Sequence, residues 1–506
     1  MGPLQRTVYL RLSLPIFFTA FLFFVDVFTV HRNSCRVDTE SSSVNYTPGT
    51  LEANFSISIP KNTEDLFNND TASNTDLVAH GQTVYMTSLL VGALVGGALS
   101  DKYGKKFVLV CFATAHAAVA LATAFLPNAI FYLVARCITG ISCCAMHICI
   151  YSLGVEWSPP KLRIWPTTLL SFVFSLGMMG LASVAYFTQD WMQFHLALAI
   201  PQILCLPLYL SIPESPKWLL LNKKFDVLEE YRSRSPKDKA CLDLLLHAVG
   251  TEVQKSDTGK NSERESVFTH FKSSTIMLRL MIMSYISLAT TLTYYGICLN
   301  IGSFGVDVYL AQFFSGLSES PSLLLPFLMK RCGRRIFTMA SLFMSGVSCA
   351  LSLLALRFYN NPALVMALAL MGKLCVQSTS CVLLLYGIEL FPTVIRQKCV
   401  GLVSLSSRLA CITVAAVVPK GTVPLVAMLC YSSGPILGAG FCLLLPETSG
   451  VPLPDTIQDC ENQPGLDLRT LSCGHRYSPA PKQERESACL SKKELEPQKE
   501  KVALTA

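Results

Sequence analysis

The sequence contains two halves of the same design. Glu156 and Arg163 recur as Glu389 and Arg396, each 233 residues later (389 − 156 and 396 − 163). Two further segments repeat in the same order: 213–215 as 446–448, and 101–106 as 330–335. Repeats that run in the same sense, with long apolar stretches between them, are typical of two similar helix bundles related by an axis along the membrane normal.

The composition indicates a membrane protein. Only 15% of the residues are charged and 51% are hydrophobic. An apolar run of about 20 residues crosses a bilayer as a helix, because an open sheet cannot satisfy its backbone hydrogen bonds in lipid. Twelve such spans are predicted: 10–30, 82–99, 107–126, 130–152, 165–187, 194–212, 275–298, 306–328, 336–356, 362–386, 399–418 and 424–445.

We therefore predict an all-α membrane protein with twelve transmembrane helices in two pseudo-symmetric six-helix bundles. The first bundle comprises residues 1–220 and the second bundle residues 275–450. A cytoplasmic linker, 221–274, joins them, and a polar cytoplasmic tail, 451–506, follows. The tail offers a segment to which cytoplasmic partners could bind.

The basic residues predict the orientation in the membrane. They gather in the short loops after the second, fourth, eighth and tenth spans, and cytoplasmic loops are rich in Lys and Arg. Both termini are then cytoplasmic. The net charge of +7 reflects this topology, and we expect no nucleic-acid partner. Arg6 and Arg11 before an apolar run also resemble a secretory signal, but the run is long for one.

The exterior segment 32–81 carries three glycosylation sequons, at Asn45, Asn54 and Asn69. Catalytic signatures such as a phosphate-binding glycine loop or a zinc-binding His-Glu-x-x-His segment do not occur in the sequence. We expect no enzyme, no cofactor and no metal site.

The repeated charges suggest a gate at the cytoplasmic ends of the helices. A carboxylate and a guanidinium there can form bridges that break when the two bundles rock apart. The alternative is a set of local ion pairs of small energy. The predicted residues of this inner gate are Asp101, Glu156, Arg163, Glu389 and Arg396. Further gating candidates are Arg136, Glu214 and Glu447.

Ionisable side chains inside the spans indicate functional positions, because they are costly in lipid. Asp26 and Arg136 are near helix ends and could reach the membrane interface, while Glu319 and Lys373 could stabilise one another. Arg408 lies deeper, with no acidic residue on its own helix, and could hold a carboxylate through two parallel hydrogen bonds. The candidate substrate contacts are Arg408, Lys373, Tyr294, Tyr295, Phe174 and Tyr386.

Several segments resemble one known family. Pro213-Glu214-Ser215-Pro216-Lys217-Trp218-Leu219, the segment Glu389 to Arg396, and the segment Gly302 to Leu310 are similar to signatures of solute carrier family 22. This family belongs to the major facilitator superfamily. The resemblance covers nearly the whole chain and implies a plasma-membrane secondary transporter that works by alternating access on small organic ions.

The same resemblance bears on the substrate. Arg408 falls where the family's anion transporters carry Arg and its cation transporters carry Asp. The anion transporters' lysine in helix 8 falls on Leu323 here, and an aromatic residue of helix 10 falls near Ser380. We expect organic anion transport. The alternatives are a cation, zwitterion or riboflavin-like vitamin carrier, or a transporter-like protein that no longer transports.

Overall fold

The structure is a computed structural model of the chain. It describes residues 3–29, 77, 80–126, 128–158, 164–188, 190–233, 239, 242–243, 273–304, 306–359, 361–392, 395–417 and 425–448. They all belong to one compact unit, Met1–Gly465. Arg163, the tail 451–506 and the three sequon residues Asn45, Asn54 and Asn69 lie outside the described residues.

Long apolar helices make up the first half. Its helices are α1 (Pro3–Phe23), α4 (Gly81–Tyr103), α5 (Lys105–Phe125), α6 (Ala129–Glu156), α7 (Ile164–Phe187), α8 (Trp191–Leu204) and α9 (Leu206–Ser211). The last two form a single apolar span, interrupted at Cys205. Proline removes a backbone donor, so Pro201 and Pro207 explain this break. Two short helices follow, α10 (Pro216–Leu221) and α11 (Phe225–Ser233).

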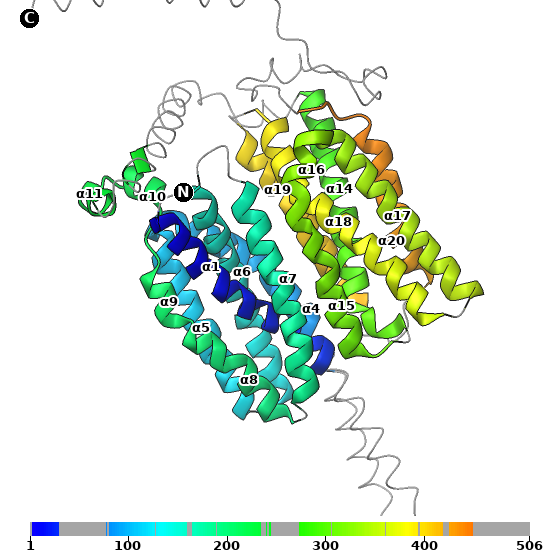
Figure 1. Cartoon of the computed structure of the whole chain (residues 1–506), viewed down its shortest axis with the longest axis horizontal. Coiled ribbons are helices and arrows are strands. Elements are labelled where there is room, and N and C mark those ends of the chain that lie inside the picture. The colour runs from blue at the N-terminus through cyan, green and yellow to red at the C-terminus, as the bar shows by residue number, and fades with distance from the viewer. Residues whose placement is uncertain are drawn as a thin grey trace, which may run out of the picture. The chain divides into compact units, whose positions relative to one another are not determined.

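The second half repeats the pattern (Figure 1). Its helices are α14 (Ser274–Leu299), α15 (Val308–Glu319), α16 (Leu325–Cys332), α17 (Arg334–Phe358), α18 (Pro362–Leu390), α19 (Arg396–Val417) and α20 (Leu425–Cys442), with short 3₁₀ turns η2 (Ile301–Phe304) and η3 (Ser320–Leu324).

One predicted span is not a continuous helix. The segment 306–328 runs through α15, the η3 turn and the start of α16. Pro321 lies at the start of η3 and Pro326 at the start of α16, so the backbone is interrupted twice. Ten described helical spans are long and apolar enough to cross a membrane. The two predicted spans outside that set are this broken one and α20.

The packing shows the internal symmetry. In the first half α5 packs on α6, α1 on α7, and α5 on α8; in the second half α17 packs on α18, α14 on α19, and α17 on α20. The halves meet through α4 with α19 and through α7 with α15. By their order in each half, α4 corresponds to α15 and α7 corresponds to α19. The two contacts between the halves are therefore equivalent to one another. The twofold relation predicted from the repeated motifs is therefore present in three dimensions.

Candidate functional site

A cavity of about 300 Å³ lies between the two halves. The first half lines it with residues of α1, of the continuation of α1 to Thr29, of α6 and of α7. The second half lines it with residues of α14, α18 and α19. The lining residues are Phe23, Phe24, His147, Tyr151, Ser171, Phe174, Thr291, Tyr294, Tyr295, Gln377, Ser380, Ser407, Arg408 and Cys411. Three of the predicted wall residues and the predicted arginine are among them.

Arg408 carries the one full charge among these lining residues. Its side chain is partly buried, and its Nη2 lies 3.8 Å from the Sγ of Cys144, which is only a weak acceptor. Within the described part of the chain, no carboxylate forms an ion pair with this guanidinium. The guanidinium N–H groups of Arg408 are therefore available to donate hydrogen bonds to a group that enters the cavity.

Flat aromatic faces surround the same space. The ring of Phe23 stacks on His147, with centroids 6.2 Å apart, and on Tyr295, with centroids 6.3 Å apart. Phe174 meets Phe23 edge to face at 5.6 Å. Offset and edge-to-face pairs of this kind are favourable and hold the rings in place. The sequence-based prediction included Phe174 and Tyr295 but missed Phe23 and His147.

Lys373 does not line the cavity. Its Nζ pairs with Glu319 at 2.8 Å and donates to the Ser315 carbonyl at 3.1 Å, and both side chains of the pair are buried. The Tyr294 hydroxyl donates to the same carboxylate at 2.7 Å. The predicted mutual stabilisation of Glu319 and Lys373 is therefore present. Because the Lys373 ammonium is already paired with Glu319, its charge is not available for the predicted substrate contact.

Three other residues singled out from the sequence lie in the protein interior, away from the expected positions. Tyr386 is fully buried away from the cavity, where its hydroxyl donates to the Pro446 carbonyl. Arg136 and Asp26 form a buried ion pair in the interior of the first half, and each residue is 3% exposed. Arg136 also donates to the Leu22 carbonyl at 2.7 Å, and Tyr132 donates to Asp26. This cluster joins α6 to α1 and its continuation.

The repeated motifs form matching networks at one end of each half, here called the motif end. In the first half, the backbone N–H groups of Lys105 and Lys106 donate to Glu214 at 3.0 and 3.1 Å. Gly104 precedes them at φ 95°, and a Cβ there would lie 2.7 Å from the Glu214 carboxylate. Glycine is thus required both by conformation and by space. The Lys105 ammonium and the Ser215 hydroxyl both contact Glu156.

The second half repeats this network in detail. Arg334 and Arg335 donate their backbone N–H groups to Glu447 at 2.9 and 3.0 Å. Gly333 takes the place of Gly104, at φ 76°. Glu389 accepts from Arg334 Nη2 at 3.1 Å and from the Thr448 hydroxyl at 2.6 Å. The lysine of the first half is replaced by an arginine, and the geometry is retained.

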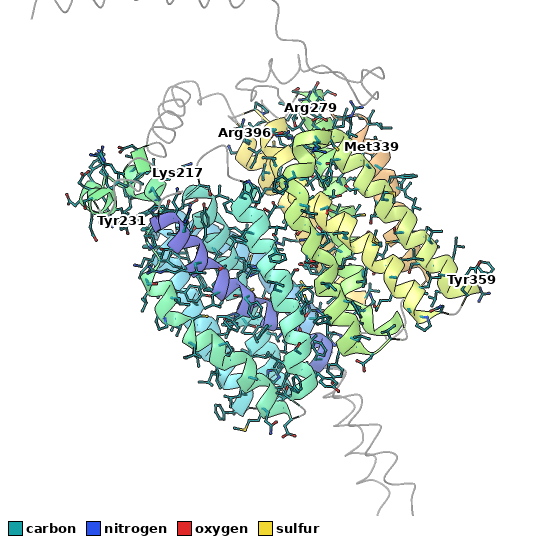
Figure 2. The ribbon with its side chains drawn as sticks, viewed as in Figure 1. Lys217, Tyr231, Arg279, Met339, Tyr359 and Arg396 are labelled. Carbon is teal, nitrogen blue, oxygen red and sulfur yellow. The ribbon has the colours of Figure 1, made fainter. Side chains whose placement is uncertain are left out.

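These contacts lie within each half and do not bridge between the halves. Glu389 pairs with Arg334, while Arg396 donates its Nε to the Phe391 carbonyl at 3.1 Å. Asp101 has an exposed side chain, and its carbonyl accepts from Trp218 at 3.1 Å. Figure 2 shows Arg396 and Arg279 at the same end of the second half. The gating bridge between halves remains a prediction for another state of the molecule.

The halves contact one another closely at the opposite end. Phe28 stacks on Tyr309 at 5.4 Å, and the Thr83 hydroxyl donates to the Ala415 carbonyl at 2.8 Å. Near the motif end, an edge-to-face contact at 5.3 Å joins Trp165 of α7 to Phe327 of α16. A smaller pocket of about 170 Å³ lies among the motif-end parts of α14, α18 and α19 and shares three lining residues with the central cavity.

Comparison with known proteins identifies the family. The family model "Major Facilitator Superfamily" matches residues 51–416. Solute carrier family 22 member 6 of Pseudopleuronectes americanus is 31% identical over 390 residues, which is 75% of this chain and 68% of that protein. Solute carrier family 22 member 13 of Homo sapiens is 31% identical over 76% of this chain and 69% of its own length. The chain belongs to solute carrier family 22.

The fold has solved counterparts within the same superfamily. The inward open conformation of the xylose transporter XylE from E. coli superposes with a TM-score of 0.63 at 17% identity, covering 90% of this chain and 99% of that one. Among the sequence relatives, organic anion transporter 3 of Oryctolagus cuniculus is 30% identical, over 77% of this chain and 72% of that relative. The predicted class, a multi-pass membrane transporter with two six-helix bundles, is confirmed.

Proposed function

We propose that this family member moves small organic anions across the plasma membrane by alternating access, with Arg408 as the contact for the anionic group. The observation that carries the proposal is a guanidinium in the central cavity without a carboxylate partner in the described chain. Arginine can hold a carboxylate through two parallel hydrogen bonds, and this attraction is strong where water is scarce. One cation and several aromatic faces suit a planar organic acid.

The two acidic side chains that a cation carrier would use are already occupied. Asp26 is paired with Arg136, and Glu319 is paired with Lys373. Neither carboxylate lines the cavity. One of the relatives, from Oryctolagus cuniculus, is named organic anion transporter 3, which also favours an anion. Transport of an organic cation or a zwitterion is therefore our second hypothesis for the substrate.

Alternating access suits the contacts between the halves. The end that carries Phe28 and Tyr309 is closed by direct packing, while the motif-end charges are held within each half. We propose that the motif end is cytoplasmic, because its loops are basic, and that both termini lie on that side. In the opposite state the two motif ends approach, and Asp101, Glu156 and Glu389 come within reach of the facing half.

Radiolabelled uptake in cells that express the chain tests this proposal. The panel contains benzoate, nicotinate, urate, an organic cation and carnitine, and surface biotinylation reports expression. We expect saturable anion uptake by the wild type and its loss in Arg408→Ala, by at least about tenfold, because a charged hydrogen bond contributes about 1.5 to 3 kcal/mol.

Arg357→Ala is the matched control, since Arg357 is an exposed arginine in the last turn of α17. It should keep both expression and uptake. Anion uptake that persists in Arg408→Ala, or uptake of the cation alone by the wild type, would refute the assignment of Arg408.

A further inference from the structure

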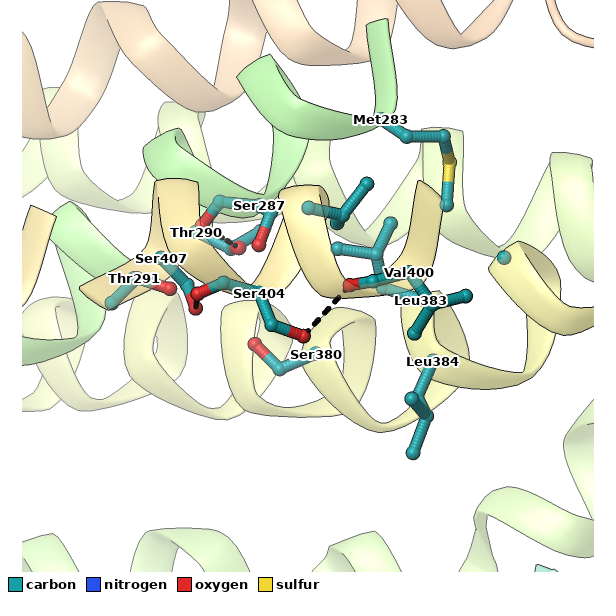
Figure 3. Close-up of a pocket in the computed structure, with 12 residues that line it drawn as sticks. Met283, Ser287, Thr290, Thr291, Ser380, Leu383, Leu384, Val400, Ser404 and Ser407 are labelled. Carbon is teal, nitrogen blue, oxygen red and sulfur yellow. Dashed lines mark hydrogen bonds between the residues drawn. The ribbon is translucent and has the colours of Figure 1, made fainter. Parts of the chain in front are cut away.

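The smaller pocket has a chemical character of its own. Its volume is about 170 Å³, and its lining includes side chains from α14, α18 and α19 (Figure 3). Among the described residues, those that line the pocket are all uncharged and all belong to the second half. Serine and threonine hydroxyls alternate with aliphatic groups on its wall: Ser287, Thr290, Thr291, Ser380, Ser404 and Ser407.

Most of these hydroxyls have already used their single proton. Ser404 donates to the Val400 carbonyl at 2.9 Å, the bond drawn in Figure 3, and Ser407 donates to the Ser404 carbonyl at 2.7 Å. Ser380 and Thr290 donate in the same way to carbonyls of their own helices, at 3.0 and 2.9 Å. A hydroxyl has one donor and two lone pairs. The pocket therefore offers hydrogen-bond acceptors and few donors.

The pocket lies close to the charged contact. Ser404 precedes Arg408 by four residues on α19, so the two side chains lie on the same face, about 6 Å apart along the axis. Thr291, Ser380 and Ser407 line both the pocket and the central cavity. A single small molecule of benzoate length can therefore contact Arg408 with one end and the hydroxyl-lined pocket with the other.

We infer that this pocket is a second substrate subsite that selects organic anions whose far end is uncharged and bears N–H or O–H donors. The inference rests on the proposed function, in which Arg408 holds the anionic end. A terminal amide, ureide or hydroxyl group would donate to Ser404, Ser407, Ser380 or Thr290. A second carboxylate would meet acceptors without a cation, so the pocket also disfavours dicarboxylates.

Two benzoates that differ only in this property test the inference. 4-Carbamoylbenzoate ends in an amide NH₂, and 4-acetylbenzoate has a methyl group in the same place. We expect the wild type to transport the carbamoyl compound with a kcat/KM about 3- to 10-fold higher, the value of one neutral hydrogen bond. Thr290→Val and Ser404→Ala should each reduce this preference toward 1 while benzoate uptake stays unchanged.

Ser433→Ala is the matched control, because Ser433 is also exposed and also donates to a carbonyl of its own helix, Leu429, at 2.7 Å. It should keep the preference. Ligand-induced shifts in the thermal unfolding of the purified full chain measure binding of the same two compounds independently of transport.

The possible failures are distinguishable. Equal kcat/KM for both compounds in the wild type, or a preference unchanged in Thr290→Val and Ser404→Ala, overturns the subsite even when benzoate is transported. Uptake of both benzoates by Arg408→Ala at the wild-type rate, with the preference retained, overturns the role of Arg408 and leaves the pocket standing. If neither benzoate is transported or shifts the unfolding midpoint, both the organic-acid assignment and this subsite are rejected.

Discussion

Two kinds of cation lie inside this protein, fully buried or partly buried, and their surroundings separate their roles. Lys373 and Arg136 are each paired with a carboxylate that is itself buried, and each pair lies within one half. Arg408 faces the space between the halves and has a cysteine sulfur as its described partner. Burial of a charge alone therefore does not identify a substrate contact here; the presence or absence of a counter-charge does.

The largest effect is expected from removal of one partner of a buried pair. Lys373→Met leaves the Glu319 carboxylate without its ammonium, 1% exposed, and only the Tyr294 hydroxyl remains among its described partners. Loss of one partner of a buried pair costs about 3 to 5 kcal/mol. We expect little folded protein at the surface, measured by biotinylation and by the thermal unfolding midpoint of the purified chain.

The double variant Glu319→Gln with Lys373→Met provides the control for this prediction. It removes both charges and should recover most of the stability and at least part of the anion uptake. Loss of uptake in a stable, well-expressed double variant would instead show that Lys373 acts on the substrate, as the sequence had suggested.

An intermediate effect separates two adjacent tyrosines. Tyr294→Phe removes a hydroxyl that donates to Glu319 at 2.7 Å, a hydrogen bond to a charged group that contributes about 1.5 to 3 kcal/mol to stability. Tyr295→Phe is the matched variant, because this ring also lines the cavity and stacks on Phe23. The unfolding midpoint should fall for Tyr294→Phe and stay near the wild-type value for Tyr295→Phe; equal midpoints would contradict this difference.

The fold was accessible from the sequence because its signals are repeated and long. The twofold offset, the apolar spans and the glycines at 104 and 333 each correspond to a structural feature. The interruption of the span 306–328 was missed, although Pro321 and Pro326 mark it. The span was predicted from its length and hydropathy, and neither quantity reflects the backbone N–H that a proline lacks.

The site was only partly accessible for a different physical reason. Arg408, Phe174 and Tyr295 were predicted from their residue types, but Lys373 could not be assigned, because its partner Glu319 lies on another helix and pairing depends on helix rotation. His147 and Gln377 were missed, since neutral polar side chains in apolar spans carry no charge signal. Gln377 lies one turn from Lys373 on α18, yet it lines the cavity while Lys373 does not.

The smallest effect is expected from a conservative substitution of Arg408. Arg408→Lys keeps the positive charge in the cavity but replaces the planar fork of donors by a compact ammonium. If Arg408 serves only electrostatics, uptake is nearly unchanged; if it holds a carboxylate by two parallel hydrogen bonds, KM for benzoate rises about 3- to 10-fold. Because Arg408 has no described counter-charge, the unfolding midpoint should move little in either case. A large fall of that midpoint would place Arg408 beside Lys373 and Arg136 as a structural cation.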